Sequence, residues 1–272
     1  MTSATPQTGY AVVNGLTMYY EMQGTGAPLI LLHGGLGATG MLGDVVPVLA
    51  ARRRVVAVDL QAHGRTADID RPLRYEHMAD DVAALIAHLG LATATVMGYS
   101  LGAGVALQLA IRHPDVVDKL VAVSATHKRA AWYPEVLAGM AQMGAAIAEP
   151  MKQSPIYRLY ADIAPRPEDW PILLTKVGDL LRQDYDWSAG LAALTMPTLL
   201  VFGDADSISP AQIAEFFGLL DGGKRDGGLD GSGMSRNRLA ILPGTTHYDI
   251  FSSPTLVSMI APFLDVPLPG AD

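Results

Sequence analysis

The chain has 272 residues, half of them apolar, which suffices for the core of one large domain. Its formal net charge is −8 and its densest basic cluster is Arg52–Arg54, so we expect no nucleic-acid partner. The absence of cysteine excludes disulfides, thiol nucleophiles and thiolate metal sites. No apolar run is long enough to span a bilayer and residues 1–8 hold no apolar signal core, so we expect a cytoplasmic protein without a membrane partner.

The first 124 residues predict alternating strands and helices. Two short strands flank Asn14-Gly15, a strong hairpin turn signal, and indicate an antiparallel pair at a sheet edge. The run Pro28–Leu32 is continuously apolar, as in a strand buried on both faces. The pattern then predicts a helix at 39–50, a strand at 54–60, a polar loop at 61–73, a helix at 75–89, a strand at 93–97, a helix at 101–112 and a strand at 120–124.

Residues 125–190 break this alternation. They contain helix-like pieces separated by prolines, show no clear strand and are rich in aromatic residues. One interpretation is a helical layer that packs its own core. The other is a helical cap over the functional edge of the sheet, with some of its side chains lining an apolar pocket.

Strands and helices resume after this segment. We expect a strand at 197–202, a helix at 210–220, a Gly-rich surface loop at 221–237, a strand at 238–242 and a closing helix at 254–264. This order predicts an α/β fold with a mostly parallel eight-stranded sheet and helices on both faces. The predicted domains are a core formed by residues 1–125 and 191–272 and a helical cap inserted at 126–190.

The stretch Gly98-Tyr99-Ser100-Leu101-Gly102 has the form G-x-S-x-G between an apolar run and a helix-like run. A sharp strand-to-helix turn at a serine is the geometry of a nucleophile elbow, which projects the hydroxyl from the turn. Residues two before and two after the serine must then be small, and both are glycine. The alternative is a Gly-rich turn with an ordinary exposed serine.

A serine hydroxyl needs a base, and a histidine base needs an acid to orient its ring. In a parallel α/β sheet the functional groups lie on loops after the carboxyl ends of strands. Three such loops offer Ser100, then Asp204 or Asp206, then His247. This is the chain order expected of triad partners in α/β-hydrolases.

Across nearly its whole length the sequence resembles the α/β-hydrolase superfamily, in particular its serine-nucleophile, esterase-like members with a helical cap. The segments that carry the resemblance are LLHGG at 31–35, VDLQAHGRT at 58–66, GYSLG at 98–102, LVFGDAD at 200–206 and GTTH at 244–247. The resemblance implies Ser100 as nucleophile and His247 as general base. It also implies an oxyanion hole formed by the backbone N–H groups of Gly35 and Leu101.

The acid is assigned by the same resemblance. Family members place it three residues after the glycine that ends the strand, which selects Asp206 over Asp204. His33 and His63 lie in motifs that shape loops in the family, so we expect structural roles for both. No two histidines have ligand-like spacing, so no metal site is expected. Residues expected to line a substrate pocket are Leu36, Tyr99, His127, Trp132, Tyr160 and Trp170.

One segment favours a different class of enzyme. Residues 35–40 read G-x-G-x-x-G between a strand and a helix, and Asp59 ends the next strand, as in dinucleotide-binding folds. However, two residues separate the strand from the first glycine, and no tyrosine is followed four residues later by lysine. A nicotinamide enzyme would also leave Ser100 and His247 unexplained.

We therefore hypothesise a cofactor-independent serine hydrolase that cleaves carboxylic esters of small to medium hydrophobic substrates. Dehalogenases and epoxide hydrolases of this fold use an aspartate nucleophile, so Ser100 argues against both. Lactonases, C–C bond hydrolases and peroxide-dependent acyl transferases share the triad and stay open as alternatives. A non-catalytic ligand-binding protein of the same fold is a further alternative. We expect a small-molecule ester as the partner, and a monomer or small homo-oligomer.

Overall fold

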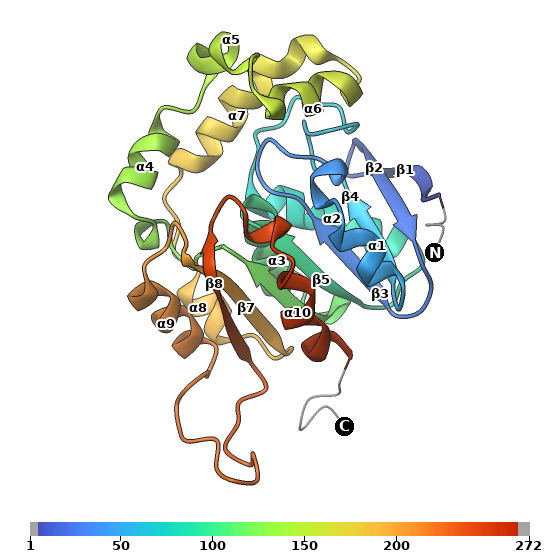
Figure 1. Cartoon of the computed structure of the whole chain (residues 1–272). Coiled ribbons are helices and arrows are strands. Elements are labelled where there is room, and N and C mark those ends of the chain that lie inside the picture. The colour runs from blue at the N-terminus through green and yellow to red at the C-terminus, as the bar shows by residue number, and fades with distance from the viewer. Residues whose placement is uncertain (1–4, 266–272) are drawn as a thin grey trace.

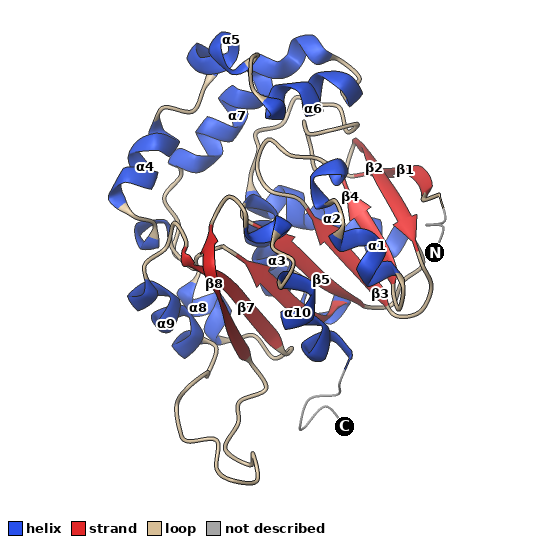
Figure 2. Cartoon of the chain, in the orientation of Figure 1, coloured by secondary structure: helices blue, strands red, loops and turns tan. Residues whose placement is uncertain are grey.

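A computed structural model describes residues 5–265 (Figures 1 and 2). Its centre is a sheet of eight strands in the order β1-β2-β4-β3-β5-β6-β7-β8. From β4 onward in this order neighbouring strands pair in parallel, whereas β1 with β2 and β2 with β4 pair antiparallel. The strands are β1 (Gln7–Val13), β2 (Leu16–Gln23), β3 (Pro28–Leu32), β4 (Arg54–Val58), β5 (Ala94–Tyr99), β6 (Val117–Val123), β7 (Thr198–Ala205) and β8 (Arg238–Thr246).

The hairpin predicted at Asn14-Gly15 is confirmed. Val13 pairs with Leu16, and both turn residues have positive φ, 47° and 80°. Two consecutive left-handed residues match the twist of the flanking strands, which explains the Asn-Gly pair. The hairpin places β1 at one edge of the sheet, and β8 forms the other edge.

Each face of the sheet has its own apolar core, because alternate residues of a strand point to opposite faces. In β3, Ile30 and Leu32 join the core under α2 and α3, whereas Leu29 and Leu31 join the core under α1 and α10. The predicted helices on both faces are therefore confirmed (Figure 2). The helices that flank the sheet are α1 (Val45–Ala50), α2 (Tyr75–His88), α3 (Leu101–Arg112), α8 (Ser188–Ala192), α9 (Pro210–Leu219) and α10 (Leu256–Asp265).

Several predicted boundaries were wrong by a few residues, among them the strand ends at 60, 120 and 202, and two errors have a clear physical cause. The helix expected at 39–50 divides into a 3-10 turn, η1 (Thr39–Leu42), and α1, because Gly43 between them has a φ of 45°. The last strand does not end at residue 242 but runs through Pro243 to Thr246. Proline is tolerated there because β8 is an edge strand, where a missing N–H donor costs no ladder hydrogen bond.

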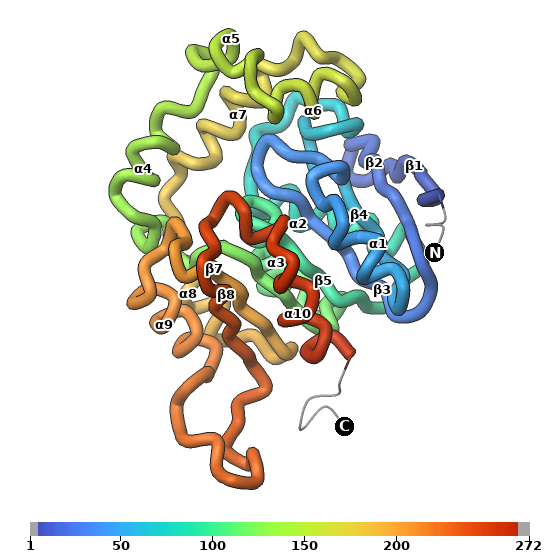
Figure 3. Tube along the Cα trace, in the orientation of Figure 1, coloured from blue at the N-terminus to red at the C-terminus, as the bar shows by residue number. Residues whose placement is uncertain are grey.

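The segment 126–190, called the helical segment below, contains no strand in the structure, only isolated bridges at Lys128 and Trp132. Its helices gather at one end of the molecule, and the loop at 221–237 projects from the opposite end (Figures 1 and 3). The boundaries of the helical segment with the core domain, at residues 126 and 190, stay a prediction. The segment comprises α4 (Pro134–Ala141), α5 (Ala148–Met151), α6 (Pro155–Ile163) and α7 (Trp170–Arg182), with 3-10 turns η3 (Arg129–Ala131), η4 (Ala145–Ile147) and η5 (Pro167–Asp169); elsewhere lie η2 (Pro114–Val116) and η6 (Ile250–Ser252).

Among residues 5–265 no helix has the length and apolar character needed to cross a membrane.

Candidate active site

Ser100 lies in a strained turn between β5 and α3. Its φ of 53° and ψ of −115° are rare for a residue with a side chain, so the surrounding structure must enforce them. A Cβ on Gly98 would lie 2.2 Å from the carbonyl oxygen of Gly102, and a Cβ on Gly102 would lie 2.4 Å from that of His33. Both glycines are therefore required for the turn to pack against itself and against β3, as the sequence predicted.

The turn brings the Ser100 hydroxyl to a histidine. Ser100 Oγ lies 3.0 Å from His247 Nε2, and His247 Nδ1 lies 3.1 Å from Asp206 Oδ1. Because a carboxylate only accepts, the proton between the last two atoms belongs to Nδ1, which leaves Nε2 free to accept from the hydroxyl. Ser100, His247 and Asp206, the carboxylate that the family resemblance selected, thus form one continuous hydrogen-bonded chain.

Asp206 is buried and receives four hydrogen bonds. Oδ1 accepts from His247 Nδ1 and, at 2.7 Å, from the backbone N–H of Ser207. Oδ2 accepts from the Gly203 N–H at 3.2 Å and from the Ser124 hydroxyl at 2.6 Å. The three donors other than His247 therefore hold the carboxylate of Asp206 in the orientation in which Oδ1 faces the His247 ring.

Asp204 has a different place. Its exposed carboxylate accepts a hydrogen bond from the Thr245 N–H at 3.1 Å, and the backbone N–H groups of Gly244 and Thr245 lower its pKa. Asp249 likewise accepts from the N–H and the hydroxyl of Thr246, at 2.7 and 2.8 Å. Both carboxylates shape the loop that carries His247, while Asp206 contacts the ring.

Tyr99, expected in the substrate pocket, supports this loop from the core. Its hydroxyl donates to the carbonyl oxygen of His247 at 2.6 Å, and its ring packs on His247 and Phe251. Burial raises the pKa of Tyr99 to about 12, so the hydroxyl keeps its proton and the hydrogen bond persists at neutral pH.

The loop after β3 lies beside the elbow. A Cβ on Gly35 would meet the Leu101 side chain at 3.5 Å, so the two predicted oxyanion donors come from adjacent segments. Leu101 is the first residue of α3, where a helix leaves its N–H groups without intrahelical acceptors. Leu36 is buried with a φ of 59°, and the Gly37 N–H closes a turn onto the Gly34 carbonyl at 3.1 Å. This geometry suits a site for a developing negative charge at the helix start.

Two buried histidines, His33 and His63, stabilise the loop after β3. His33 Nε2 accepts from the Leu60 N–H at 3.1 Å, so Nδ1 carries the proton and donates to the Gly34 carbonyl at 2.7 Å. Complete burial lowers the pKa of His33 to about 4 and that of His63, which packs against it, to about 3. Both rings are neutral at pH 7, and their bonds to backbone groups agree with the structural roles predicted for them.

Trp132 of the helical segment lies directly beside His247. Its indole lies edge-on to the His247 ring, with ring centres 5.4 Å apart, and its Nε1–H donates to the Tyr185 hydroxyl at 3.2 Å. Tyr185 stacks on Trp187 at 4.2 Å, and Tyr75 of α2 contacts both rings. We call Trp132, Tyr185, Trp187 and Tyr75 the aromatic wall.

Three expected pocket residues lie elsewhere. Trp170 has no exposed surface and donates to the Ala148 carbonyl at 3.1 Å, so no ligand can touch it without repacking. Tyr160 packs on Trp170 inside the helical segment. The buried His127 ring contacts Phe216 and Glu215 of α9. Tyr160 borders a small hollow with Arg166 and Asp169, which contains none of the residues gathered around Ser100. The expectation that Trp170 and His127 line a pocket is corrected, because composition alone does not distinguish a segment's own core from a binding surface.

Sequence reasoning missed two contributors. Ser124 directly follows the buried strand β6, a position that could have drawn attention to its hydroxyl. Tyr185 was one of several aromatic residues in the helical segment, with no local signal that its hydroxyl holds Trp132. Both depend on contacts between residues far apart in the chain, at separations of 82 for Ser124 and 53 for Tyr185.

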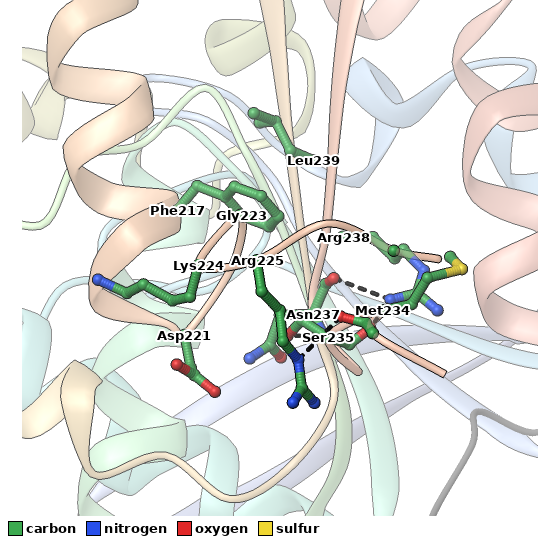
Figure 4. A pocket seen from close by; sticks show the side chains of 12 residues that line it. Phe217, Asp221, Gly223, Lys224, Arg225, Met234, Ser235, Asn237, Arg238 and Leu239 are labelled. Carbon is green, nitrogen blue, oxygen red and sulfur yellow. Dashed lines mark hydrogen bonds between the residues drawn. The ribbon is translucent and has the colours of Figure 1, made fainter. Parts of the chain in front are cut away.

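A separate hollow of about 610 Å³ lies at the far end of the molecule, where the 221–237 loop meets α9 and β8 (Figure 4). Its lining includes Phe217, Lys224, Arg225, Met234 and Arg238, and none of the residues gathered around Ser100. Within residues 5–265, no three His, Asp or Glu side chains are arranged to hold a metal ion.

Comparison with known proteins agrees with this geometry. A family model described as the alpha/beta hydrolase fold matches residues 27–164. The chain is similar to a pimeloyl-[acyl-carrier protein] methyl ester esterase of Photobacterium profundum, with 30% identity over 220 residues that cover 72% of this chain and 83% of the relative. The crystal structure of E-2-(acetamidomethylene)succinate hydrolase superposes with a TM-score of 0.74 and 21% identity, covering 96% of this chain and all of the other.

A third relative matches over a shorter stretch. A soluble epoxide hydrolase of a Corynebacterium species is 36% identical over 113 residues, which is 40% of this chain. The chain spans only 38% of that relative's length.

Proposed function

Because the chain belongs to the α/β-hydrolase superfamily, we propose that it is a serine hydrolase that cleaves carboxylic esters of small to medium hydrophobic substrates. The observation that carries the proposal is the hydrogen-bonded chain from Ser100 through His247 to Asp206. A strained serine, a base in the accepting tautomer and a fully bonded acid have no joint purpose in a non-catalytic protein.

In the proposed reaction, Ser100 Oγ attacks the ester carbonyl while its proton passes to His247 Nε2. The N–H groups of Gly35 and Leu101 stabilise the tetrahedral oxyanion, each donor contributing about 10²–10³ in rate. His247 then protonates the leaving alcohol, which departs and leaves an acyl group on Ser100. Water, deprotonated by His247 Nε2, attacks this acyl-enzyme. The bond from the carbonyl carbon to Ser100 Oγ then breaks, the acid departs, and His247 returns the proton to Ser100. Each step uses side chains and water alone, so the proposal needs no cofactor.

The aromatic wall supports a hydrophobic substrate. Trp132 contacts the catalytic base directly, so a group bound next to the scissile bond meets its indole. We also propose that the helical segment acts as a cap, since it supplies Trp132 and its α6 places Leu159 within 3.4 Å of a Cβ built on Gly40 of η1. An aromatic surface beside the base favours flat or branched apolar groups over charged ones.

An epoxide hydrolase is disfavoured in spite of the partial similarity to one. The nucleophile expected for that chemistry is an aspartate, and the elbow of this chain carries Ser100. Lactonase and C–C bond hydrolase activities would use the same three residues, and the substrate panel below separates lactonase activity from ester hydrolysis.

A panel of p-nitrophenyl esters of increasing acyl length, tested beside γ- and δ-lactones and an aryl amide, measures the proposed activity. We expect highest kcat/KM for short to medium acyl esters and loss of turnover in Ser100→Ala. A folded protein that hydrolyses none of the esters contradicts the proposal, and a clear preference for lactones redirects it.

A further inference from the structure

We propose that Ser124 is a positioning residue of the active site, which acts by holding the carboxylate of Asp206. The inference rests on the proposed function, because it assigns Ser124 a part in the same Ser100–His247–Asp206 machinery. Ser124 does not touch His247 or the reacting atoms, so any effect on catalysis must pass through Asp206.

The placement of Ser124 is unusual. It follows the last residue of β6 and continues the sheet, since its N–H donates to the Val201 carbonyl of β7 at 2.9 Å. Its φ is 53°, a left-handed conformation that residues with a side chain rarely adopt. Such strain persists only where surrounding contacts enforce it, and it concentrates at functional sites.

The strain has an identifiable result. It directs the Ser124 hydroxyl to Asp206 Oδ2 at 2.6 Å, in a position with no solvent exposure. Among residues 5–265, His247 and Ser124 are the two side chains that donate to this carboxylate, one on each oxygen. Without Ser124, Oδ2 would keep only the longer bond from the Gly203 N–H, at 3.2 Å.

The bond from Ser124 therefore restrains the Asp206 carboxylate at Oδ2, the oxygen that does not contact His247. A short charge-assisted bond at Oδ2 opposes rotation of the carboxylate, which keeps Oδ1 aimed at Nδ1 when His247 takes up the Ser100 proton. Because Ser124 has no solvent exposure, removing its hydroxyl leaves a buried carboxylate oxygen short of a donor.

Two variants separate the hydroxyl from the strain. Ser124→Gly removes the hydroxyl and relieves the left-handed backbone, whereas Ser124→Ala removes the hydroxyl and keeps the strain. We expect both to lower kcat for the best p-nitrophenyl ester and the rate constant of labelling by a fluorophosphonate about 10- to 100-fold, with KM little changed. Ser124→Gly should have the higher Tm of the two. Thr126→Val, which removes a buried hydroxyl that bonds the Lys128 carbonyl instead, should keep the wild-type rates.

A spectroscopic readout distinguishes positioning from general stability. The downfield proton resonance of His247 Nδ1–H reports its bond to Asp206, and we expect it to shift in Ser124→Gly but not in Thr126→Val. Wild-type rates in Ser124→Gly, or a loss of rate with an unchanged resonance, overturn the inference. If the wild-type protein itself neither hydrolyses esters nor reacts with the fluorophosphonate, it is the proposed function that fails.

Discussion

The carboxyl edge of the sheet and the helical segment differ in how uniformly their backbones are packed. At the edge, backbone packs directly on backbone: a Cβ on Gly98 or Gly102 would lie within 2.5 Å of a carbonyl oxygen. The helical segment is mixed: a Cβ on Gly178 of α7 would lie 2.2 Å from the Met143 carbonyl oxygen, whereas Gly139 of α4 has no atom within 4 Å of its Cβ position. The edge therefore holds its side chains in one geometry, whereas parts of the helical segment leave room for sequence change. This contrast suits the proposed function, in which Ser100 and His247 need one fixed geometry and the proposed cap can vary.

The largest effect is expected at the acid. Asp206→Asn should lower kcat by about 10⁴, because an amide can donate to His247 Nδ1 and so favours the wrong tautomer. The matched variant Asp204→Asn changes an exposed side chain bound to the Thr245 N–H and should change kcat less than severalfold. Steady-state kinetics on one p-nitrophenyl ester compares them, and the reverse result would transfer the acid role to Asp204.

The next effect tests the close packing of the edge. Gly102→Ala should lower the free energy of unfolding by about 3 kcal/mol or more, since the new methyl would overlap the backbone of β3. Urea unfolding monitored by tryptophan fluorescence measures this. A variant as stable as the wild type would show that β3 and α3 can separate at little cost.

A smaller effect concerns pH and the buried histidines. The pKa of His33 is about 4 and that of His63 about 3 in the folded protein, against about 6.5 for an unfolded histidine. The unfolded chain therefore binds more protons below pH 6.5, so each group removes about 1.4 kcal/mol of stability per pH unit as the pH falls from about 6.5 toward its folded pKa. Above pH 6.5 neither group contributes.

Urea unfolding between pH 7 and pH 5 checks this slope. His63→Asn keeps a donor in place of Nδ1, which bonds the Gln61 carbonyl at 2.8 Å, but does not titrate, so its slope should be shallower than that of the wild type. The exposed His88 on α2 provides the control, and His88→Asn should leave the slope unchanged. Equal slopes in all three proteins would contradict the neutral, buried state of His63.

The smallest effect tests the tolerance of the helical segment. Gly139→Ala should raise the free energy of unfolding by about 0.5–1 kcal/mol, because alanine restricts the unfolded chain and fits α4 without contact. Thermal unfolding gives the sign, and esterase activity should stay the same. A lower Tm would mean that α4 has close neighbours at this position.

The sequence predicts features that depend on local rules and misses contacts that depend on long-range packing. The sheet, its hairpin and the elbow follow from local rules: continuous apolar runs, the Asn-Gly turn and two glycines around Ser100. The order of the loops predicted that Ser100, Asp204 or Asp206, and His247 lie together, the family resemblance selected Asp206, and the distances agree with that choice. The 2.6 Å bond from Ser124 to Asp206 and the place of Trp132 beside His247 depend on long-range packing, for which the sequence has no periodic signal.

Boundaries failed where one residue overrode a pattern. Gly43 divides a predicted helix because its positive φ interrupts the helical backbone, and Pro243 continues a strand because it lies at an edge. In the helical segment, Trp170 and Trp132 look alike in sequence, yet one is fully buried and the other borders the His247 ring. Only the tertiary arrangement distinguishes them.

The most direct test of the account is site mapping after treatment with a fluorophosphonate, by intact mass and then by peptide mass spectrometry. We expect one phosphonyl adduct per chain, located on Ser100, with no adduct in Ser100→Ala. A folded wild-type protein that stays unlabelled, or that is labelled at another residue, would contradict the assignment of Ser100 as the nucleophile.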